Sequence, residues 1–219
     1  MKISVAIDGP AGAGKSTIAK LVGKKFNLMY INTGAMYRAV ALLAKRNNIE
    51  TTNIDSLITM IDGMEMHFEN DDLILDGTNI QNEITLPEIS EIVSNYASIP
   101  EVRSKLVTLQ RKMSEKYNVI MDGRDIGTVV LKDSSYKFFL TATAEERANR
   151  RYTELTARKI KCNYDEILEN IKHRDYLDEN RDVDPLRKAE DAILIDSTNL
   201  SINEVVNKIV KVINLNINN

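Results

Sequence analysis

The N-terminal part of the chain reads ISVAIDGPAGAGKST over residues 3–17, and the architecture can be built outward from this run. Its first residues, Ile3 to Ile7, form an apolar segment rich in β-branched side chains, which is typical of a strand buried in a parallel sheet. An Asp-Gly pair ends this segment. From Ser16 to Phe26, apolar residues recur at helical spacing, at Ile18, Leu21 and Val22. The run therefore predicts a strand, a glycine-rich turn and a helix.

The glycine-rich turn fits the pattern G-x-x-x-x-G-K-[ST], and it has the strand before it and the helix after it that this motif requires. Glycines let the backbone curl until several N–H groups face phosphate oxygens, with help from the helix dipole. Lys15 adds a positive charge for the β- and γ-phosphates. The alternative is a turn that merely ends a strand. The pattern favours binding of ATP by Gly9, Pro10, Ala11, Gly12, Ala13, Gly14, Lys15, Ser16 and Thr17.

A metal site is predicted next to this loop. Mg²⁺ in phosphate-loop proteins is held by the loop hydroxyl and by an acid at the end of a neighbouring strand. Ser16 supplies the hydroxyl, and Asp122 follows the short apolar run of residues 119–121, so it is expected to hold Mg²⁺ through water. The alternative reading of Asp122 is a residue of an Asp-Gly turn. Asp8 and Asp196 are weaker candidates for the same role.

The rest of the chain alternates predicted strands and helices. This order predicts an α/β fold with a parallel, doubly wound sheet. One region breaks the order, because residues 64–75 read as a hairpin with one solvated face. The hairpin suggests an insert at about residues 56–95. The other predicted elements are helices at 36–45, from Pro87 and from Pro100, strands at 119–122, 136–140 and 192–196, and helices capped by Thr143 with Glu146 and by Ser201 with Glu204.

Composition limits the classes of protein that the chain can belong to. Of its 219 residues 43% are apolar, which is ordinary for a globular protein, and the net charge of −3 does not suit a nucleic-acid-binding surface. No apolar run approaches the length needed to cross a bilayer, and the N-terminus does not read as a signal peptide. Cys162 is the sole cysteine, which suits a reducing compartment. We expect a cytoplasmic protein, monomeric, without nucleic-acid or membrane partners.

Arginines are concentrated in the C-terminal third of the chain. Guanidinium groups stay charged and grip phosphate in two places, so they suit an acceptor that is itself a phosphate and needs no general base. The alternative is a solvated charged helix face, since Glu146–Arg150 and Glu154–Arg158 have the spacing of simple helical ion pairs. His67 and His173 belong to no catalytic arrangement. The arginines between residues 147 and 187 are Arg147, Arg150, Arg151, Arg158, Arg174, Arg181 and Arg187.

Taken together, these motifs resemble those of the bacterial cytidylate kinases along nearly the whole chain. The phosphate loop is shared by many families, whereas the stretches T-G-A-M-Y-R and D-G-R-D-I-G-T-V-V are far more particular. Two positions depart from the family pattern: Asn32 stands where Asp is usual, and Thr85 stands where Arg is common. The matching stretches are Ile7–Thr17, Thr33–Arg38, Asp122–Val130, Glu145–Ala148 with Arg150 and Arg151, Arg174 and Asp175 with Asp178 and Arg181, and Asp184–Leu186.

The resemblance implies a single P-loop kinase domain over residues 1–219, with a core at 1–55 and 96–219. It also implies a CMP-binding insert at about 56–95 and a short helical lid at about 148–165. The implied reaction is transfer of the γ-phosphate of ATP, with Mg²⁺, to CMP and dCMP. The implied catalytic residues are Lys15, Arg124, Arg181, Arg150 and Arg151. The implied CMP contacts are Thr33, Arg38, Ser94, Arg103, Arg124, Asp125, Asp178 and Arg181.

Within this implied site, Ser94, Arg103 and Asp125 would read the base. Cytosine presents an amino donor beside acceptors, which a carboxylate and a guanidinium complement, whereas uracil presents the reverse pattern to the carboxylate. A kinase of the same fold acting on UMP or shikimate is the first alternative. The second is a GTP-binding switch, which would need a guanine-reading N-K-x-D segment, and the sequence has none.

Overall fold

The computed structural model describes residues 2–217, and side chains up to residue 215. The chain forms two compact units. Within the described residues, the first unit comprises 2–30 and 118–217, and the second comprises 31–117. The expected insert at 56–95 lies inside the second unit. Among residues 2–217, no helix has both the length and the apolar character that crossing a bilayer requires.

The first unit is built on a five-stranded sheet in the order β2-β6-β1-β7-β8. Its strands are β2 (Met29–Asn32), β6 (Val119–Gly123), β1 (Ser4–Asp8), β7 (Tyr136–Thr141) and β8 (Ile193–Asp196). β1 is parallel to β6 and to β7, and β7 is parallel to β8. In this register Ile7 lies opposite Asp122. The parallel α/β sheet expected from the sequence is therefore present, and the carboxyl ends of its strands share one edge.

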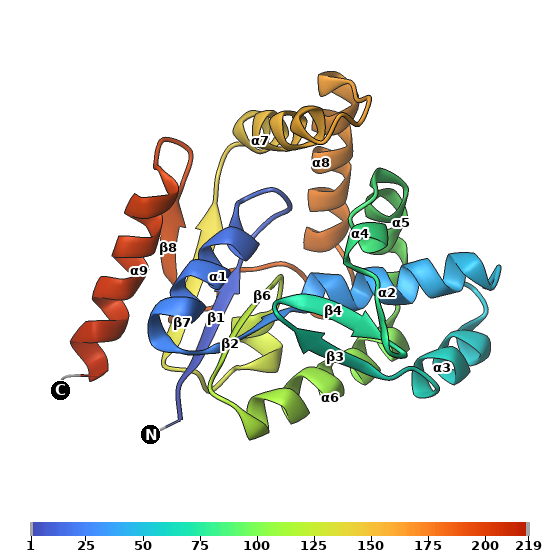
Figure 1. The fold of residues 1–219 in the computed structure, drawn as a ribbon, viewed down its shortest axis with the longest axis horizontal. Coiled ribbons are helices and arrows are strands. Elements are labelled where there is room, and N and C mark those ends of the chain that lie inside the picture. The colour runs from blue at the N-terminus through green and yellow to red at the C-terminus, as the bar shows by residue number, and fades with distance from the viewer. Residues whose placement is uncertain (1, 218–219) are drawn as a thin grey trace. The chain divides into compact units, whose positions relative to one another are not determined.

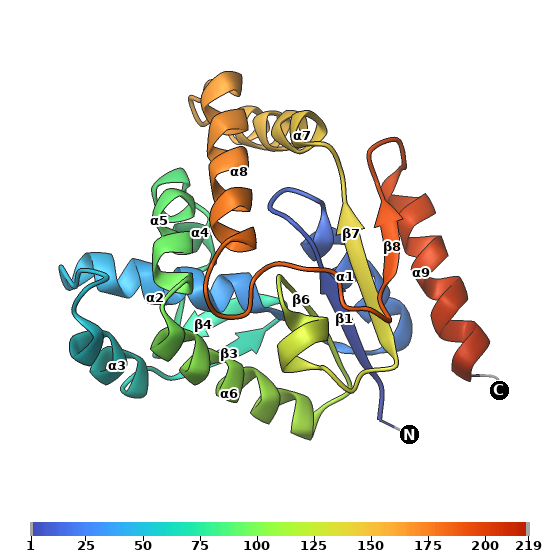
Figure 2. The ribbon, with the colours of Figure 1, turned by 180° about the vertical axis from the view of Figure 1, so that it is seen from behind.

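Two helices cover one face of this sheet. α1 (Lys15–Phe26) and α9 (Ile202–Ile217) lie on the same side of β1, β7 and β8 (Figures 1 and 2). The sheet contributes Val5, Ile7, Phe138 and Leu140 to the shared core, and the helices contribute Ile18, Val22, Ile209 and Ile213. Burial of side chains of this size is the main stabilising term of such a layer. Because successive strand residues face opposite ways, Ala6 and Asp8 point to the other face.

On that other face the chain forms η1 (Ile126–Val130), a short π-helical turn directly after β6. After β7 the chain forms two helices rich in charged residues, near the carboxyl ends of the strands (Figure 1). These are α7 (Ala144–Ala157) and α8 (Tyr164–Glu179), which pack against each other. Thr143 caps α7 as predicted, since its side chain accepts the N–H of Glu146. The lid proposed for 148–165 corresponds to most of α7 and the connection to α8.

The second unit combines helices with a three-stranded sheet in the order β3-β4-β5. β3 (Met66–Glu69) and β4 (Asp72–Leu75) form the predicted hairpin, and Asn70 and Asp71 turn it with positive φ angles of 50° and 69°. Positive φ at both central residues is the signature of a tight hairpin turn. The remaining elements are α2 (Thr33–Arg46), α3 (Ile54–Asp62), β5 (Thr78–Asn79), α4 (Gln81–Ile84), α5 (Pro87–Ala97) and α6 (Pro100–Lys116).

Candidate active site

The phosphate loop joins β1 to α1 and has the backbone conformation that the glycines allow. Gly9, Gly12 and Gly14 have φ angles of 147°, 74° and 86°, in the region that side chains disfavour. Gly14 is the N-cap of α1, and no side chain caps the first N–H groups of this helix. A helix N-terminus of this kind attracts phosphate through its N–H groups and its dipole.

Lys15 lies inside this loop. Its side chain is 6% exposed, and Nζ donates a hydrogen bond to the carbonyl oxygen of Pro10 at 2.6 Å. Burial lowers the pKa of Lys15 well below its ordinary value, and the charge of Arg124 lowers it further. Anionic phosphate oxygens beside this nitrogen would favour its charged form. The loop therefore holds the side-chain nitrogen of Lys15 in a fixed position.

The predicted metal ligands lie side by side. Ser16 Oγ donates to Asp122 Oδ2 at 2.9 Å, and the hydroxyl of Tyr30 donates to Asp122 Oδ1 at 2.8 Å. A hydroxyl and a carboxylate beside a phosphate loop are the hard oxygen groups that suit Mg²⁺ and its water shell. Tyr30 was not predicted to take part, because nothing in its local sequence marks it as polar-facing. The two rival acids have other partners: Asp8 accepts from the backbone of η1, and Asp196 accepts from Thr198.

Four of the residues expected to contact CMP are brought together in the first unit. Arg124 Nε donates to Asp178 Oδ2 at 2.8 Å. Arg181 lies 4.0 Å from Asp178 and 3.7 Å from Asp125, measured between its guanidinium nitrogens and their carboxylate oxygens. Asp125, Asp178 and Arg181 are buried, and Arg124 is partly exposed. Residues that are distant in sequence thus form one cluster of two guanidinium groups and two carboxylates.

The charges of this cluster depend on one another. Burial alone would raise the pKa of Asp178, but the positive charges of Arg124, Arg174 and Arg181 outweigh it, so this pKa lies below its ordinary value. Burial would likewise lower the pKa of Arg124, but Asp178 outweighs burial and the net shift is upward. Asp178 and Arg124 therefore each favour the charged form of the other.

The other expected CMP contacts belong to the second unit. Thr33, Ser94 and Arg103 are buried there, at 2%, 5% and 1% exposure, and Arg38 is partly exposed. Arg103 Nη1 donates to the carbonyl oxygen of Ala97 at 3.3 Å, and its guanidinium carbon lies 5.7 Å from the centre of the Tyr37 ring. Asn32, which departs from the family pattern, caps α2 by accepting the N–H of Ala35 at 2.9 Å. Helix α2 consequently begins at Thr33, earlier than its apolar pattern predicted.

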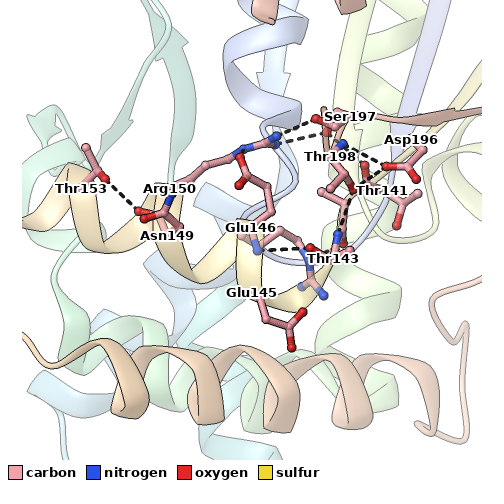
Figure 3. A network of polar contacts seen from close by, with 12 residues as sticks. Thr141, Thr143, Glu145, Glu146, Asn149, Arg150, Thr153, Asp196, Ser197 and Thr198 are labelled. Carbon is pink, nitrogen blue, oxygen red and sulfur yellow. Dashed lines mark hydrogen bonds and ion pairs between the residues drawn. The ribbon is translucent and has the colours of Figure 1, made fainter. Parts of the chain in front are cut away.

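The two expected lid arginines lie on α7. Arg150 Nε contacts Glu146 at 2.9 Å, and its Nη atoms donate to the hydroxyl of Ser197 at 3.1 Å and to its carbonyl oxygen at 2.6 Å (Figure 3). A side chain on Gly14 would approach Arg150 Nη1 to 3.9 Å, so this guanidinium lies beside the phosphate loop. Arg151 instead pairs with Glu154 at 2.9 Å. Part of the arginine cluster therefore forms helix-surface pairs, as the alternative reading anticipated.

Arg147 is an arginine to which the sequence assigned no individual role. It is buried, and it donates to the carbonyl oxygens of Ala142 at 2.9 Å and Ala11 at 3.0 Å. It also pairs with Asp175 at 2.6 Å. One side chain thus ties the phosphate loop to both α7 and α8. Its position just after the capping box of α7 was visible in the sequence, but its contact across 136 residues with Ala11 was not.

A parallel sheet whose first strand runs through this loop into a helix beginning with lysine defines a P-loop α/β fold. The family model for cytidylate kinase matches residues 5–215. A cytidylate kinase from Clostridium perfringens is 69% identical over 207 residues, covering 94% of this chain and 95% of the relative. A second, from Clostridium acetobutylicum, is 62% identical over 213 residues, covering 97% and 98%. The chain belongs to the cytidylate kinase family.

The fold is also found in solved structures. A crystal structure of an uncharacterized protein from Eubacterium ventriosum superposes with a TM-score of 0.53 at 14% identity, covering 98% of this chain and 99% of that one. At this level of identity the likeness concerns the fold alone.

Proposed function

We propose that this protein transfers the γ-phosphate of ATP to CMP, giving ADP and CDP, and that dCMP is a second acceptor. The observation that carries the proposal is the 69% identity to a cytidylate kinase over nearly the full chain. The cluster of Arg124, Asp125, Asp178 and Arg181 also supports it, because these charged groups suit a nucleoside monophosphate. Cys162 as sole cysteine suits a cytosolic location, where we infer that a monomer works.

On the donor side, residues Gly9 to Thr17 would bind the phosphates of ATP. The N–H groups at the start of α1 and the ammonium of Lys15 would surround the β- and γ-phosphates. To do so, Lys15 exchanges its hydrogen bond with Pro10 for phosphate oxygens, and its charged form is then favoured. Ser16 and, through water, Asp122 would hold Mg²⁺, which neutralises phosphate charge when it is bound.

On the acceptor side, the attacking oxygen belongs to a phosphate that is already ionised, so no general base is needed. The main obstacle is repulsion between two polyanions. Arg124 and Arg181 would neutralise the acceptor phosphate and Asp178 would bind the ribose, within the cluster described above. In the second unit, Arg38 would bind the phosphate, Thr33 the nucleoside, and Ser94 and Arg103 the base. Catalysis then consists of positioning and charge neutralisation.

The lid would complete the donor site. Arg150 lies beside the phosphate loop, and Arg151 one residue further along α7, so both are proposed to meet the triphosphate as the lid closes. Closure would exclude water, which would otherwise accept the phosphate and waste ATP. The contacts of Arg147 with Ala11 and Asp175 give α7 and α8 a direct mechanical link to the loop during this motion.

The test is a panel of acceptors with release of ADP as the readout. Purified protein is given ATP and Mg²⁺ with CMP, dCMP, UMP or shikimate. We expect CMP and dCMP to stimulate ADP release strongly and the other two to do so weakly. The matched control is the Lys15→Ala protein prepared in parallel, which reports any contaminating ATPase.

Two outcomes would contradict the proposal. Preference for UMP or shikimate would assign the site to another small acceptor on the same fold. Absence of stimulation by every acceptor would revive the GTP-binding switch, which equilibrium binding of GTP to the same preparation would then test.

A further inference from the structure

Asp8 is a buried carboxylate to which the proposed reaction gives no role. It ends β1, and its side chain is 3% exposed. Its oxygens each accept one backbone N–H: Oδ1 from Ile126 and Oδ2 from Gly127, both at 2.7 Å. These two N–H groups belong to the first residues of η1, immediately after Asp125. A single side chain thus binds the start of η1 to the end of the central strand.

The approach of η1 to Asp8 depends on a glycine. A side chain on Gly127 would place its Cβ 3.2 Å from Asp8 Oδ2 and 3.2 Å from Lys137 Cδ. Lys137 has little freedom to withdraw, because its Nζ donates to the carbonyl oxygen of Lys132 at 2.5 Å and to Asp191 at 2.8 Å. A methyl group at residue 127 would therefore be tightly packed on two sides, and Asp8 or η1 would have to shift by a few tenths of an ångström to admit it.

These contacts fix the backbone that carries Asp125. The carbonyl oxygen of Asp125 accepts the N–H of Val129 at 2.9 Å inside η1, and its carboxylate faces Arg181 at 3.7 Å. The peptide groups that follow Asp125 are held by Asp8, which restricts the backbone that carries the Asp125 side chain. On the other side, Asp8 is bonded to Gly9, the first residue of the phosphate loop. The same residue therefore joins the loop to the segment of Asp125.

We propose that Asp8 is a positioning residue for nucleobase recognition, which fixes the backbone from which Asp125 presents its carboxylate to the base of the acceptor. The proposal rests on the proposed function, since it needs a cytosine nucleotide as acceptor. It differs from the reading of Asp8 as a metal-binding acid, because the oxygens of Asp8 bind the backbone of η1, whereas the hydroxyl of Ser16 lies beside Asp122. Asp8 acts through Asp125 and touches neither substrate.

The first test is the Asp8→Asn variant, which has the same shape as the wild type. An amide has one accepting oxygen, so its NH₂ group must face one of the two backbone N–H groups, and that end of η1 is pushed away. We expect kcat/KM for CMP divided by kcat/KM for UMP to fall about tenfold, because small misplacement of a positioned group is costly. The KM for ATP should change less than this ratio, because the hydrogen bonds of Asp8 go to η1. Asn also removes a charge that acts on Lys15, so the ratio between acceptors, and not kcat alone, is the readout.

A second variant perturbs the same contact between Asp8 and η1 and leaves the carboxylate of Asp8 intact. Gly127→Ala should lower the CMP-to-UMP ratio in the same direction, because its methyl group separates η1 from Asp8. The matched control is Ser134→Ala. Ser134 is buried and donates to the carbonyl oxygen of Ser4 at 2.5 Å, at the opposite end of β1. The Ser134→Ala variant loses a buried hydrogen bond that does not involve η1. It should therefore lower the stability of the protein and leave the CMP-to-UMP ratio unchanged.

The third arm asks whether the effect passes through Asp125. In an Asp125→Ala background, Asp8→Asn should lower the ratio no further, because the carboxylate that it positions is gone. A full additional loss in that background would overturn the proposal. An unchanged CMP-to-UMP ratio in Gly127→Ala would also overturn it. This second criterion can be applied even if Asp8→Asn fails to fold. Wild-type protein that ignores CMP would instead refute the proposed function, and the inference with it.

Discussion

The side-chain nitrogen of Lys15 is held inside the phosphate loop by the carbonyl oxygen of Pro10, which accepts its hydrogen bond at 2.6 Å. Burial disfavours the charged form of Lys15, and the phosphates of a nucleotide bound as proposed would favour it, most of all in the state in which phosphate charge is greatest. In the proposed reaction, this buried group would contribute to the rate more than to ground-state binding.

We therefore expect Lys15→Ala to lower kcat by about 100-fold or more, the scale of losing one charge-stabilising donor. Binding of CMP alone, measured by calorimetry, should remain close to that of the wild type. Lys24→Ala is the control, since Lys24 lies exposed on the same helix. Unchanged turnover in Lys15→Ala would remove this residue from the chemistry.

The proposed role of Asp125 leads to a prediction about the preference for CMP over UMP. If Asp125 reads the base as proposed, replacement by Ala would leave the amino group of cytosine without its acceptor, and an unsatisfied polar group costs about 1–3 kcal/mol. We expect kcat/KM for CMP to fall about tenfold or more, with a much smaller loss for UMP. Asp133→Ala, an exposed acid in the same unit, serves as the control. Equal losses with both acceptors would show that Asp125 does not read the base.

Among the elements, those with a complete local signal were predictable. β1, β6, β7 and β8 are apolar, and three of them end at or next to an acid, so the sequence indicated strands. β2 is as short as β8, but it ends at Asn32 with no acid or Asp-Gly pair to mark its end, and its place in the sheet shows it to be a strand. The two-residue β5 likewise exists through its pairing with β4. Local pattern cannot reveal an element that a distant partner creates.

The same limit applies to the site. The phosphate loop is contiguous, and the sequence predicted its strand, turn and helix together. The pair of Arg124 with Asp178 joins residues 54 positions apart, and before the fold was known only resemblance connected them. The double hydrogen bond from η1 to Asp8 was missed entirely, because it uses backbone N–H groups that no residue type announces.

The N-terminus of α9 leads to a prediction about stability. Ser201 and Glu204 form the predicted capping box of α9: the N–H of Ser201 donates to Glu204 Oε2 at 2.8 Å, and the N–H of Glu204 donates to Ser201 Oγ at 3.3 Å. Ser201→Ala should lower the free energy of unfolding by about 1 kcal/mol, as for other lost caps. Urea denaturation measures it. Ser201→Thr keeps the hydroxyl and should lose far less; equal losses would contradict the capping role.

On the scale of the whole molecule, the charged cluster around Asp178 links stability to pH. The pKa of Asp178 lies below 3.8 because three arginines outweigh the effect of burial. The folded state therefore prefers the ionised form more than the unfolded state does. Its contribution is fully present above the unfolded pKa and is lost as pH falls through the folded pKa.

We expect the wild type to lose stability steeply as pH is lowered from about 5 to about 2, with part of this slope due to Asp178. Asp178→Asn cannot titrate, so its unfolding free energy should depend less on pH in that range. The control is Asp133→Asn, an exposed acid, whose slope should equal that of the wild type. Parallel slopes for all three proteins would show that the ion pairs of Asp178 contribute nothing to acid stability.

The close packing of the phosphate loop on β7 has a genetic counterpart. Gly9 has a φ angle of 147°, and a Cβ atom on it would overlap the carbonyl oxygen of Leu140, an atom of the main chain that no rotamer change can move away. Every missense change of one nucleotide in a glycine codon introduces a side chain. Codon 9 is therefore a position where each such mutation displaces the loop, and we infer that selection removes all of them alike, whatever the chemical character of the new amino acid.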